Sequence, residues 1–133
     1  MADKIPEEFA DLLTREKVAF ANLAIVLQDG TPHVSPIWFD YQDGLIIINT
    51  ARGRVKDKVM HRHPRVALAI SEPANPDRYL LIRGPVVEET EEGGYEGICD
   101  LNLKYHGNRS YPRVPGQVRV IYKVRPERVF GSK

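Results

Sequence analysis

The chain has 133 residues, and its 19 Lys and Arg residues against 18 Asp and Glu residues give a formal net charge of +1. This balance argues against a polybasic nucleic-acid coat or membrane-surface protein, because both need a large excess of positive charge. The 42% of hydrophobic and 28% of charged residues are typical of a folded globular protein rather than a disordered one. We expect a single domain spanning residues 1–133.

Cysteine usage and hydropathy exclude further classes. Cys99 is the single cysteine, so the chain has neither an intrachain disulfide nor a zinc site built from cysteines. No stretch approaches the roughly 18 consecutive apolar residues that cross a bilayer, and residues 1–8 lack the apolar run of a signal peptide. We therefore expect a cytoplasmic protein with no membrane and no nucleic-acid partner.

The first half of the chain predicts a short helix and then strands. Residues 6–15 carry apolar side chains at helical spacing after a proline. Asp-Gly pairs at 29–30 and 43–44 are short hairpin signals between apolar runs, which predicts an antiparallel meander. Pro32 and Pro36 cannot donate to a neighbouring strand, so their strand should be an edge strand, bulged, or unpaired on one side there. The strands are expected at residues 18–27, 34–41 and 45–50.

The second half predicts two more helices and further strands. A helix over residues 54–63 should stop at Pro64, and an acidic helix over 88–103 should be weakened by Gly93 and Gly94. Strands are expected at residues 66–70, 79–87 and 118–129, the last after a polar loop at 106–116. About six strands joined by hairpins, with about three helices, indicate a mainly β fold, a small antiparallel β-barrel with flanking helices.

The densest polar feature follows the third predicted strand, which ends in Asn49 and Thr50. A glycine turn and a helix start come next, with Arg52, Arg54 and Lys56 around them. Cations at a helix N-terminus oppose the helix dipole, so a negative group should compensate for them. Free backbone N–H groups, guanidinium forks and an ammonium group are the donors that phosphate prefers. The sequence predicts an anion site here, against the alternative of a solvated basic helix face.

The segment from Pro36 to Phe39 is a second candidate. Strand alternation puts Pro36 and Trp38 on one face, with Ile37 and Phe39 on the other. A proline in this strand leaves a partner carbonyl free, where a flat heterocycle can dock, but a core tryptophan explains the pattern equally well. The four histidines show no metal-ligand spacing, no catalytic triad order is present, and Cys99 is expected to be a buried apolar residue.

Several motifs, taken together and in order, resemble the pyridoxamine 5′-phosphate oxidase-like split β-barrel family. The first are Gly30-x-Pro32-x-Val34-x-Pro36-x-Trp38, Asp43-Gly44, Asn49-Thr50-Ala51-Arg52-Gly53-Arg54-x-Lys56 and Pro64-Arg65-Val66-Ala67-Leu68. The later ones are Arg78-Tyr79, Arg83-Gly84-x-Val86-Val87, Tyr111-Pro112-x-x-Pro115-Gly116 and Glu127-Arg128-Val129. The later motifs resemble one branch of that family, the flavin/deazaflavin oxidoreductases of the B type, which are described as F420-dependent.

The resemblance implies a six-stranded antiparallel split β-barrel, FMN-binding-protein-like, that forms a homodimer with a cofactor site at the subunit interface. Arg54 and Lys56 match the positions that bind the cofactor phosphate, with Arg52 and Thr50 beside them. Asn49 belongs to the same motif.

The resemblance also implies how the cofactor ring is held. The strand from Pro36 to Trp38 would lie along the ring, and Tyr79 and Tyr111 would come from nearby or from the other subunit. Either tyrosine, or solvent, would supply the proton.

The chain departs from true pyridoxamine phosphate oxidases, because it is shorter and lacks their C-terminal arginine and histidine elements. Vitamin B6 oxidation is therefore not expected. The anion site is rich in arginine and poor in hydroxyls, which favours F420 over FMN. The expected activity is hydride transfer from F420H2 to a small unsaturated acceptor. The alternatives are an FMN-dependent oxidoreductase, a non-catalytic flavin or deazaflavin carrier, and a module that binds an anionic partner through residues 52–65.

Overall fold

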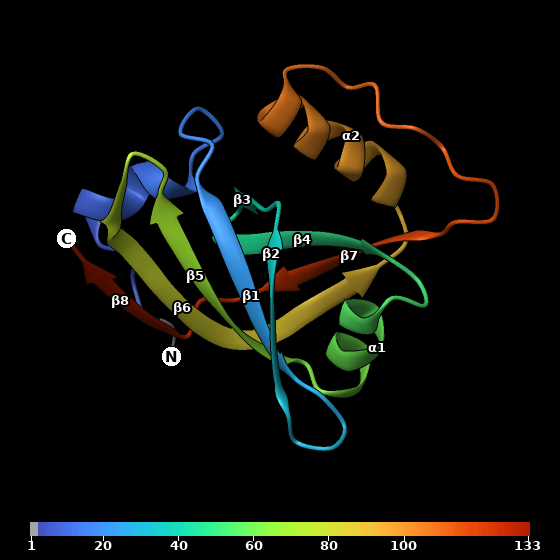
Figure 1. Cartoon of the computed structure of the whole chain (residues 1–133), viewed down its shortest axis with the longest axis horizontal. Coiled ribbons are helices and arrows are strands. Elements are labelled where there is room, and N and C mark those ends of the chain that lie inside the picture. Colours follow the sequence, from blue (N-terminus) through green and yellow to red (C-terminus); the bar gives the residue numbers. More distant parts are fainter. Residues whose placement is uncertain (1–2) are drawn as a thin grey trace.

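The protein is built on one sheet of eight strands, against which the helices pack (Figure 1). The structure, a computed structural model, describes residues 3–133. The strands are β1 (Phe20–Val26), β2 (Pro32–Ile37), β3 (Asp40–Gln42), β4 (Leu45–Ala51), β5 (Arg65–Glu72), β6 (Asn75–Thr90), β7 (Arg119–Val124) and β8 (Arg128–Ser132). The helices are a short 3-10 helix (Glu7–Leu13), α1 (Val55–Arg62) and α2 (Gly94–His106).

All strand pairs are antiparallel, in the order β2-β1-β5-β6-β7-β4-β3, with β8 paired to β6. This confirms the mainly β fold with flanking helices. The barrel is not closed, because β2 and β3 lie at opposite ends of this order. As expected for a strand with two prolines, β2 is an edge strand.

The strand count of six was wrong because two predicted strands are each divided. The strand expected at 34–41 ends at Ile37, and the chain turns inward at Phe39, which is fully buried, before β3 begins. The strand expected at 118–129 is interrupted around Pro126, and β8 then joins a different neighbour from β7. Both hairpins predicted at the Asp-Gly pairs form, β1 with β2 and β3 with β4, but the continuous meander was wrong because β2 and β3 lie at opposite ends of the strand order.

The long strand β6 divides the sheet into two halves. Up to Pro85 it pairs with β5 and β8, and together with β1 and β2 these form the first half-sheet. From Val86 onward it pairs with β7, which with β4 and β3 forms the second half-sheet. Gly84 lies at the crossing, where a Cβ would clash with the backbone carbonyl of Arg125. Glycine at this position therefore lets the β7–β8 connection cross β6.

The acidic helix predicted at 88–103 begins later than expected. Residues up to Thr90 belong to β6, and α2 starts at Gly94 after Gly93, which adopts a left-handed backbone with φ of 75°. The glycine pair therefore marks the junction between strand and helix instead of weakening a helix. As expected, Cys99 is buried.

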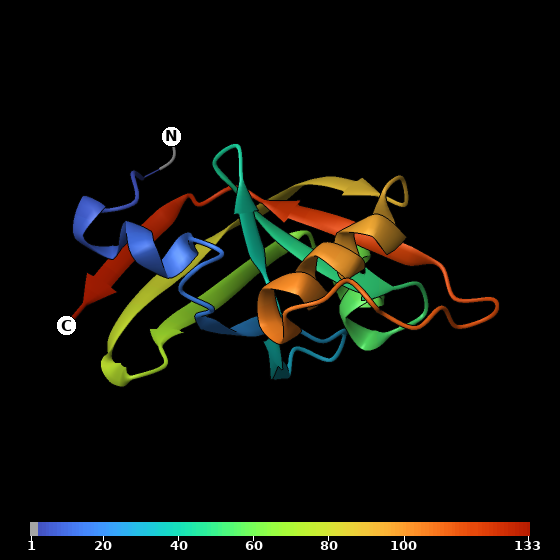
Figure 2. The same ribbon diagram turned by 90° about the horizontal axis from the view of Figure 1, so that it is seen from above.

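The core fills the space enclosed by the curved sheet, the 3-10 helix and α1. Its largest fully buried side chains are Leu12, Leu23, Phe39, Ile46, Ile48, Met60, Ile70, Leu80, Ile82, Val120, Tyr122 and Val124. In Figure 2, α2 lies across the second half-sheet, and the loop that follows it runs alongside this helix before entering β7. No helix within residues 3–133 combines the length and the apolar character required to cross a membrane.

Candidate functional site

The turn between β4 and α1 presents an uncapped helix start. Gly53 has a φ of 94°, a conformation that glycine adopts at little cost. No side chain caps α1, so its first N–H groups are free to bind a ligand. The backbone N–H of Gly53 donates to Asp57 Oδ2 at 2.8 Å, and the buried Tyr122 hydroxyl donates to Asp57 Oδ1 at 2.7 Å. These bonds fix the turn in place.

Arg52 has a different role from the one that the sequence predicts. Its Nη1 lies 2.9 Å from Asp57 Oδ1 and 2.6 Å from Glu89 Oε2, and its Nε lies 2.9 Å from Glu91 Oε2. Hydrogen bonds to Glu89 and Glu91 raise the pKa of Arg52 further above its usual value. Two of its three nitrogens, Nη1 and Nε, are thus engaged by carboxylates, and Arg52 braces the turn. Glu89 and Glu91 were predicted to belong to an acidic helix, but Glu89 lies near the end of β6 and Glu91 just after it, and both bind this guanidinium.

Arg54 and Lys56 are left without such partners. Among residues 3–133, no carboxylate lies within 4.0 Å of either side chain. Lys56 Nζ lies 3.5 Å from Ser35 Oγ on β2. Burial lowers the pKa of Lys56, and the charge of Arg54 lowers it further. An anion bound at this helix start would relieve both effects.

A third cation, Arg119, joins this region and was missed by the sequence analysis. It is 6% exposed, and its Nε donates to Asn49 Oδ1 at 2.9 Å. Burial lowers the pKa of Arg119, and the nearby charge of Arg54 acts in the same direction. Arg119 pairs with Ala51 in the register between β7 and β4. This pairing across about 70 residues of chain has no signal in a local motif.

The two polar residues at the end of β4 face in opposite directions. Asn49 lies under α2, where its Nδ2 donates to the Gly94 carbonyl at 2.8 Å while its Oδ1 accepts from Arg119. Thr50 is fully buried, and its hydroxyl has no hydrogen-bond partner among residues 3–133. Asn49 thus orients Arg119 and anchors α2, whereas the Thr50 hydroxyl is a buried polar group that no described residue satisfies.

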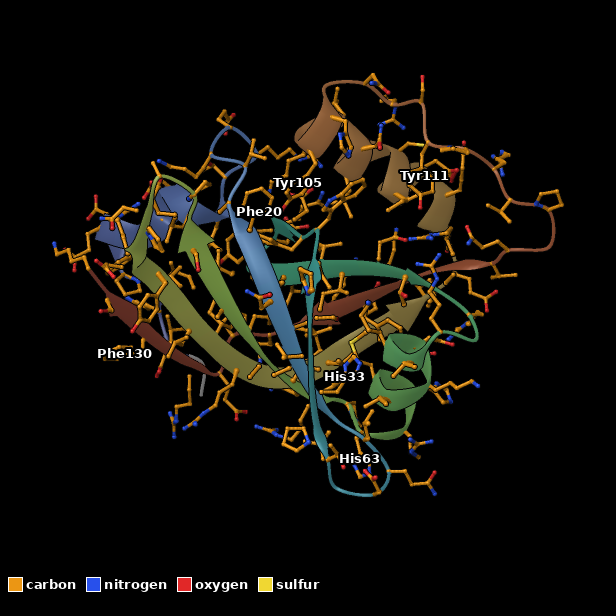
Figure 3. All side chains as sticks on the ribbon, in the orientation of Figure 1. Phe20, His33, His63, Tyr105, Tyr111 and Phe130 are labelled. Carbon is orange, nitrogen blue, oxygen red and sulfur yellow. The ribbon has the colours of Figure 1, made fainter. Side chains whose placement is uncertain are left out.

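Trp38 belongs to an aromatic cluster with α2 and its following loop, part of which is labelled in Figure 3. Its ring stacks on Tyr105 with centroids 5.3 Å apart, and Tyr111 approaches it edge-on at 6.5 Å. The ring of Tyr111 also lies 5.5 Å from the Arg119 guanidinium. The structure therefore brings Trp38, Tyr111 and Arg119 together.

Pro36 and Tyr79 lie elsewhere. Pro36 is exposed on the first half-sheet, opposite Asn22 of β1, and β2 ends before Trp38. The expected shared face of Pro36 and Trp38 is therefore not formed. Tyr79 pairs with Ser71 near the end of β5 and with Ser132 at the end of β8. In Figure 1 the C-terminal ends of these two strands lie away from α1. Within residues 3–133, no group of three His, Cys, Asp or Glu side chains is suited to hold a metal ion.

Comparisons with known proteins place this arrangement in a family. Residues 5–133 match the model of the pyridoxamine 5′-phosphate oxidase family. A solved F420 reductase is 32% identical, with a TM-score of 0.84 and coverage of 95% of this chain and 98% of its own. No curated protein matches the sequence.

Two more distant structures share the fold. The conserved hypothetical protein Rv2991 from Mycobacterium tuberculosis is 22% identical, with a TM-score of 0.74 and coverage of 99% of this chain and 86% of its own. General Stress Protein 26 from Bacillus anthracis is 16% identical, with a TM-score of 0.69 and coverage of 95% and 92%. The family match and the similarity to the F420 reductase confirm the resemblance drawn from the motifs. This chain belongs to the pyridoxamine 5′-phosphate oxidase family and is of the flavin/deazaflavin oxidoreductase type.

Proposed function

We propose that this protein binds F420 and catalyses hydride transfer from F420H2 to a small unsaturated acceptor. The observation that carries the proposal is the pair of cations, Arg54 and Lys56, that lies without a carboxylate partner at an uncapped helix start. The 32% identity with an F420 reductase over almost the whole chain supports the choice of cofactor. When bound, reduced F420 supplies a hydride from C5 of its ring.

The residues at the helix start fit a phosphate group. Arg54 offers a planar fork of donors, Lys56 an ammonium group, and α1 its free N–H groups. Arg52 and Asp57 hold the intervening turn, so these donors are oriented before a ligand arrives. A bound anion raises the pKa of Lys56, so affinity should weaken as the pH rises through the lowered pKa of free Lys56.

The aromatic cluster provides the surface for the cofactor ring. Trp38 is fixed by Tyr105, and Tyr111 is fixed by its backbone carbonyl, which accepts the Tyr95 hydroxyl at 2.6 Å. Fixed rings orient a flat ligand and exclude water from it. Tyr111 is the better placed proton donor of the two predicted tyrosines, because Tyr79 lies far from this cluster in the same chain.

A homodimer completes the proposal. The outer face of the first half-sheet is apolar, with Val34 67%, Leu81 43% and Phe130 59% exposed. It is also hollowed, with a cavity of about 520 Å³ that these side chains line together with Arg83 and Arg128. Exposed apolar patches of this kind mark interaction sites, and a second copy of the chain buries the same face on both partners. Tyr79 and Pro36 would then contribute from the partner.

FMN is the second candidate, and one observation favours it. Ser35 places a hydroxyl beside Lys56, which the sequence analysis did not count. The terminal phosphate of FMN is a compact dianion that binds hydroxyls as well as cations. Both cofactors therefore need to be tested separately.

The test is titration of the purified protein with F420 and with FMN, followed by visible absorption. The variant with Arg54→Ala and Lys56→Ala should bind F420 more than about 100-fold more weakly, since each charge-assisted hydrogen bond is worth roughly 1.5–3 kcal/mol. The matched control combines Lys58→Ala and Arg62→Ala, which remove the same charge from exposed positions of α1. Unchanged affinity in the first variant would refute the phosphate assignment, and tighter binding of FMN would replace F420.

A further inference from the structure

A cavity of about 400 Å³ lies between α2 and the loop that follows it. Tyr95 of α2 forms one wall, and Val114 to Gly116 of the loop form another. The remaining walls come from Gln117 and from two guanidinium groups, those of Arg113 and Arg119. The cavity thus combines apolar surface with two permanent positive charges.

Arg119 is a buried charge without a counterion. Its hydrogen bonds go to neutral groups, Asn49 Oδ1 at 2.9 Å and Gln117 Oε1 at 3.5 Å. Burial lowers the pKa of Arg119 and the positive charge of Arg54 lowers it further, whereas the neighbouring Tyr111 side chain acts in the opposite direction. A buried charge without an opposite partner is costly, so the site favours occupation by an anion.

Arg113 is positioned at the same cavity. Its guanidinium lies 3.7 Å from the centre of the Tyr95 ring, and the Tyr95 hydroxyl is bound to the Tyr111 carbonyl. Among residues 3–133, no carboxylate lies within 4.0 Å of Arg113 or Arg119. This includes the carboxylate of Glu96, which follows Tyr95 on α2. Both guanidiniums are therefore available to the same ligand.

We propose that this cavity binds a carboxylate carried on a carbon skeleton, held by Arg113 and Arg119. Guanidinium groups match the planar carboxylate with paired hydrogen bonds, and the walls at Val114 and Pro115 accommodate an apolar chain. The site is distinct from the phosphate site at Arg54 and Lys56 but adjoins it, because the charge of Arg54 reaches Arg119. Two sources supply this chemistry, and both rest on the proposed function: the acceptor, or the glutamate tail of F420.

The first experiment uses the protein without a cofactor, so its outcome does not depend on the proposed function. Calorimetric titration with glutarate should show binding, whereas glutaramide, which has the same skeleton without charge, should not bind. Arg113→Gln and Arg119→Lys should each weaken glutarate binding about tenfold or more, as loss of a charge-assisted bond predicts.

The matched control is Arg109→Gln, which removes a charge from the same loop that is already paired with Asp100. Because Arg113 is exposed, its variant should fold even if a substitution at the buried Arg119 does not. NMR provides a second readout. The Arg119 Nε–H donates to Asn49 Oδ1, and its resonance should shift when glutarate is added. Equal binding of glutarate and glutaramide, or wild-type affinity in Arg113→Gln, overturns the proposal.

The second experiment identifies the source of the carboxylate. If it is the cofactor tail, Arg113→Gln should weaken binding of F420 and leave binding of a tail-free form unchanged. If it is the acceptor, the variant should bind both forms like the wild type, while the F420-loaded variant loses affinity for cinnamate and not for its methyl ester. If the wild type does not bind F420, the proposed function is refuted. The titration with glutarate still shows whether the cavity binds a carboxylate.

Discussion

At the scale of single residues, the site depends on which charges are paired and which are not. Arg52, Arg54 and Lys56 lie within one short stretch, yet Arg52 contacts three carboxylates while the other two contact none among residues 3–133. Asp57 is central to this division, because it binds Arg52, the Gly53 N–H and the Tyr122 hydroxyl together. The paired charges build the turn, and in the proposed site the unpaired charges bind the ligand.

Replacement of Asp57 tests this division. Asp57→Ala removes the carboxylate that accepts from the Gly53 N–H and binds Arg52, and it leaves the buried Tyr122 hydroxyl only the backbone carbonyl of residue 57, so it should lower the free energy of unfolding by roughly 2–3 kcal/mol. The matched control is Glu91→Ala, which removes an exposed carboxylate from the same guanidinium and should cost no more than about 1 kcal/mol. Urea denaturation measures both, and equal effects would show that Asp57 contributes no more than a surface ion pair.

The same carboxyl group makes stability depend on pH. Burial by itself would raise the pKa of Asp57, but hydrogen bonds from Tyr122, Gly53 and Arg52 together hold it below its usual value. The stability that Asp57 supplies is therefore present above the pKa of the unfolded chain and is lost as the pH falls through the lower folded value.

At the scale of elements, α2 and β7 position the residues that the sequence analysis missed. Gly94 begins α2 against the backbone of Arg119, and a Cβ on it would lie 2.6 Å from the Arg119 carbonyl oxygen. The Gly94 carbonyl also accepts the Asn49 amide. The close approach of this helix to β7 therefore sets where Arg119 and the cavity beside it lie.

Gly94→Ala should push α2 away from β7 and lower the free energy of unfolding by about 1–3 kcal/mol, because the added methyl group meets backbone atoms that cannot rotate aside. Glu96→Ala, at an exposed position of the same helix, should change it by less than about 0.5 kcal/mol. Thermal unfolding measures both variants. A Gly94→Ala protein as stable as the wild type would show that α2 shifts freely.

The elements also show how far the sequence could be interpreted. The periods of apolar residues predicted α1, most strands and the edge position of β2, because these depend on local alternation and on proline chemistry. They missed the divisions at Phe39 and Pro126, where the chain changes partners between half-sheets, since partner choice depends on residues far along the chain. The cluster at Arg54 and Lys56 was visible as a contiguous motif. Arg119 was not, because only the register of β7 against β4 brings it there.

At the scale of the whole molecule, the two half-sheets have different surfaces. The second half-sheet is covered by α2 and carries the cations and the aromatic cluster. The first half-sheet exposes a row of apolar residues, with Leu81 of β6 between Ala69 of β5 and Phe130 of β8. In the proposed function, the second half-sheet binds the ligand and the first half-sheet forms the contact between two copies of the chain.

Leu81→Glu should therefore prevent the proposed homodimer from forming, because it places a charge on both sides of a two-fold contact. Leu103→Glu is a matched control, since Leu103 on α2 is 42% exposed against 43% for Leu81 but lies outside the first half-sheet. Sedimentation of the two variants and the wild type measures the outcome. A monomeric wild type, or a Leu81→Glu variant that remains dimeric, would remove this face as the contact.

The single strand β6 belongs to both half-sheets, and Gly84 marks the point at which it passes from one to the other. Its backbone amides and carbonyls form the hydrogen bonds to β5, β7 and β8. If β6 detached, both half-sheets would therefore lose backbone hydrogen bonds at the same time. We therefore expect the two halves to melt together and amide exchange in the central strands to require opening of the entire chain. A ligand bound on one half should then protect the amides of the other half as well, through the strand that both halves share.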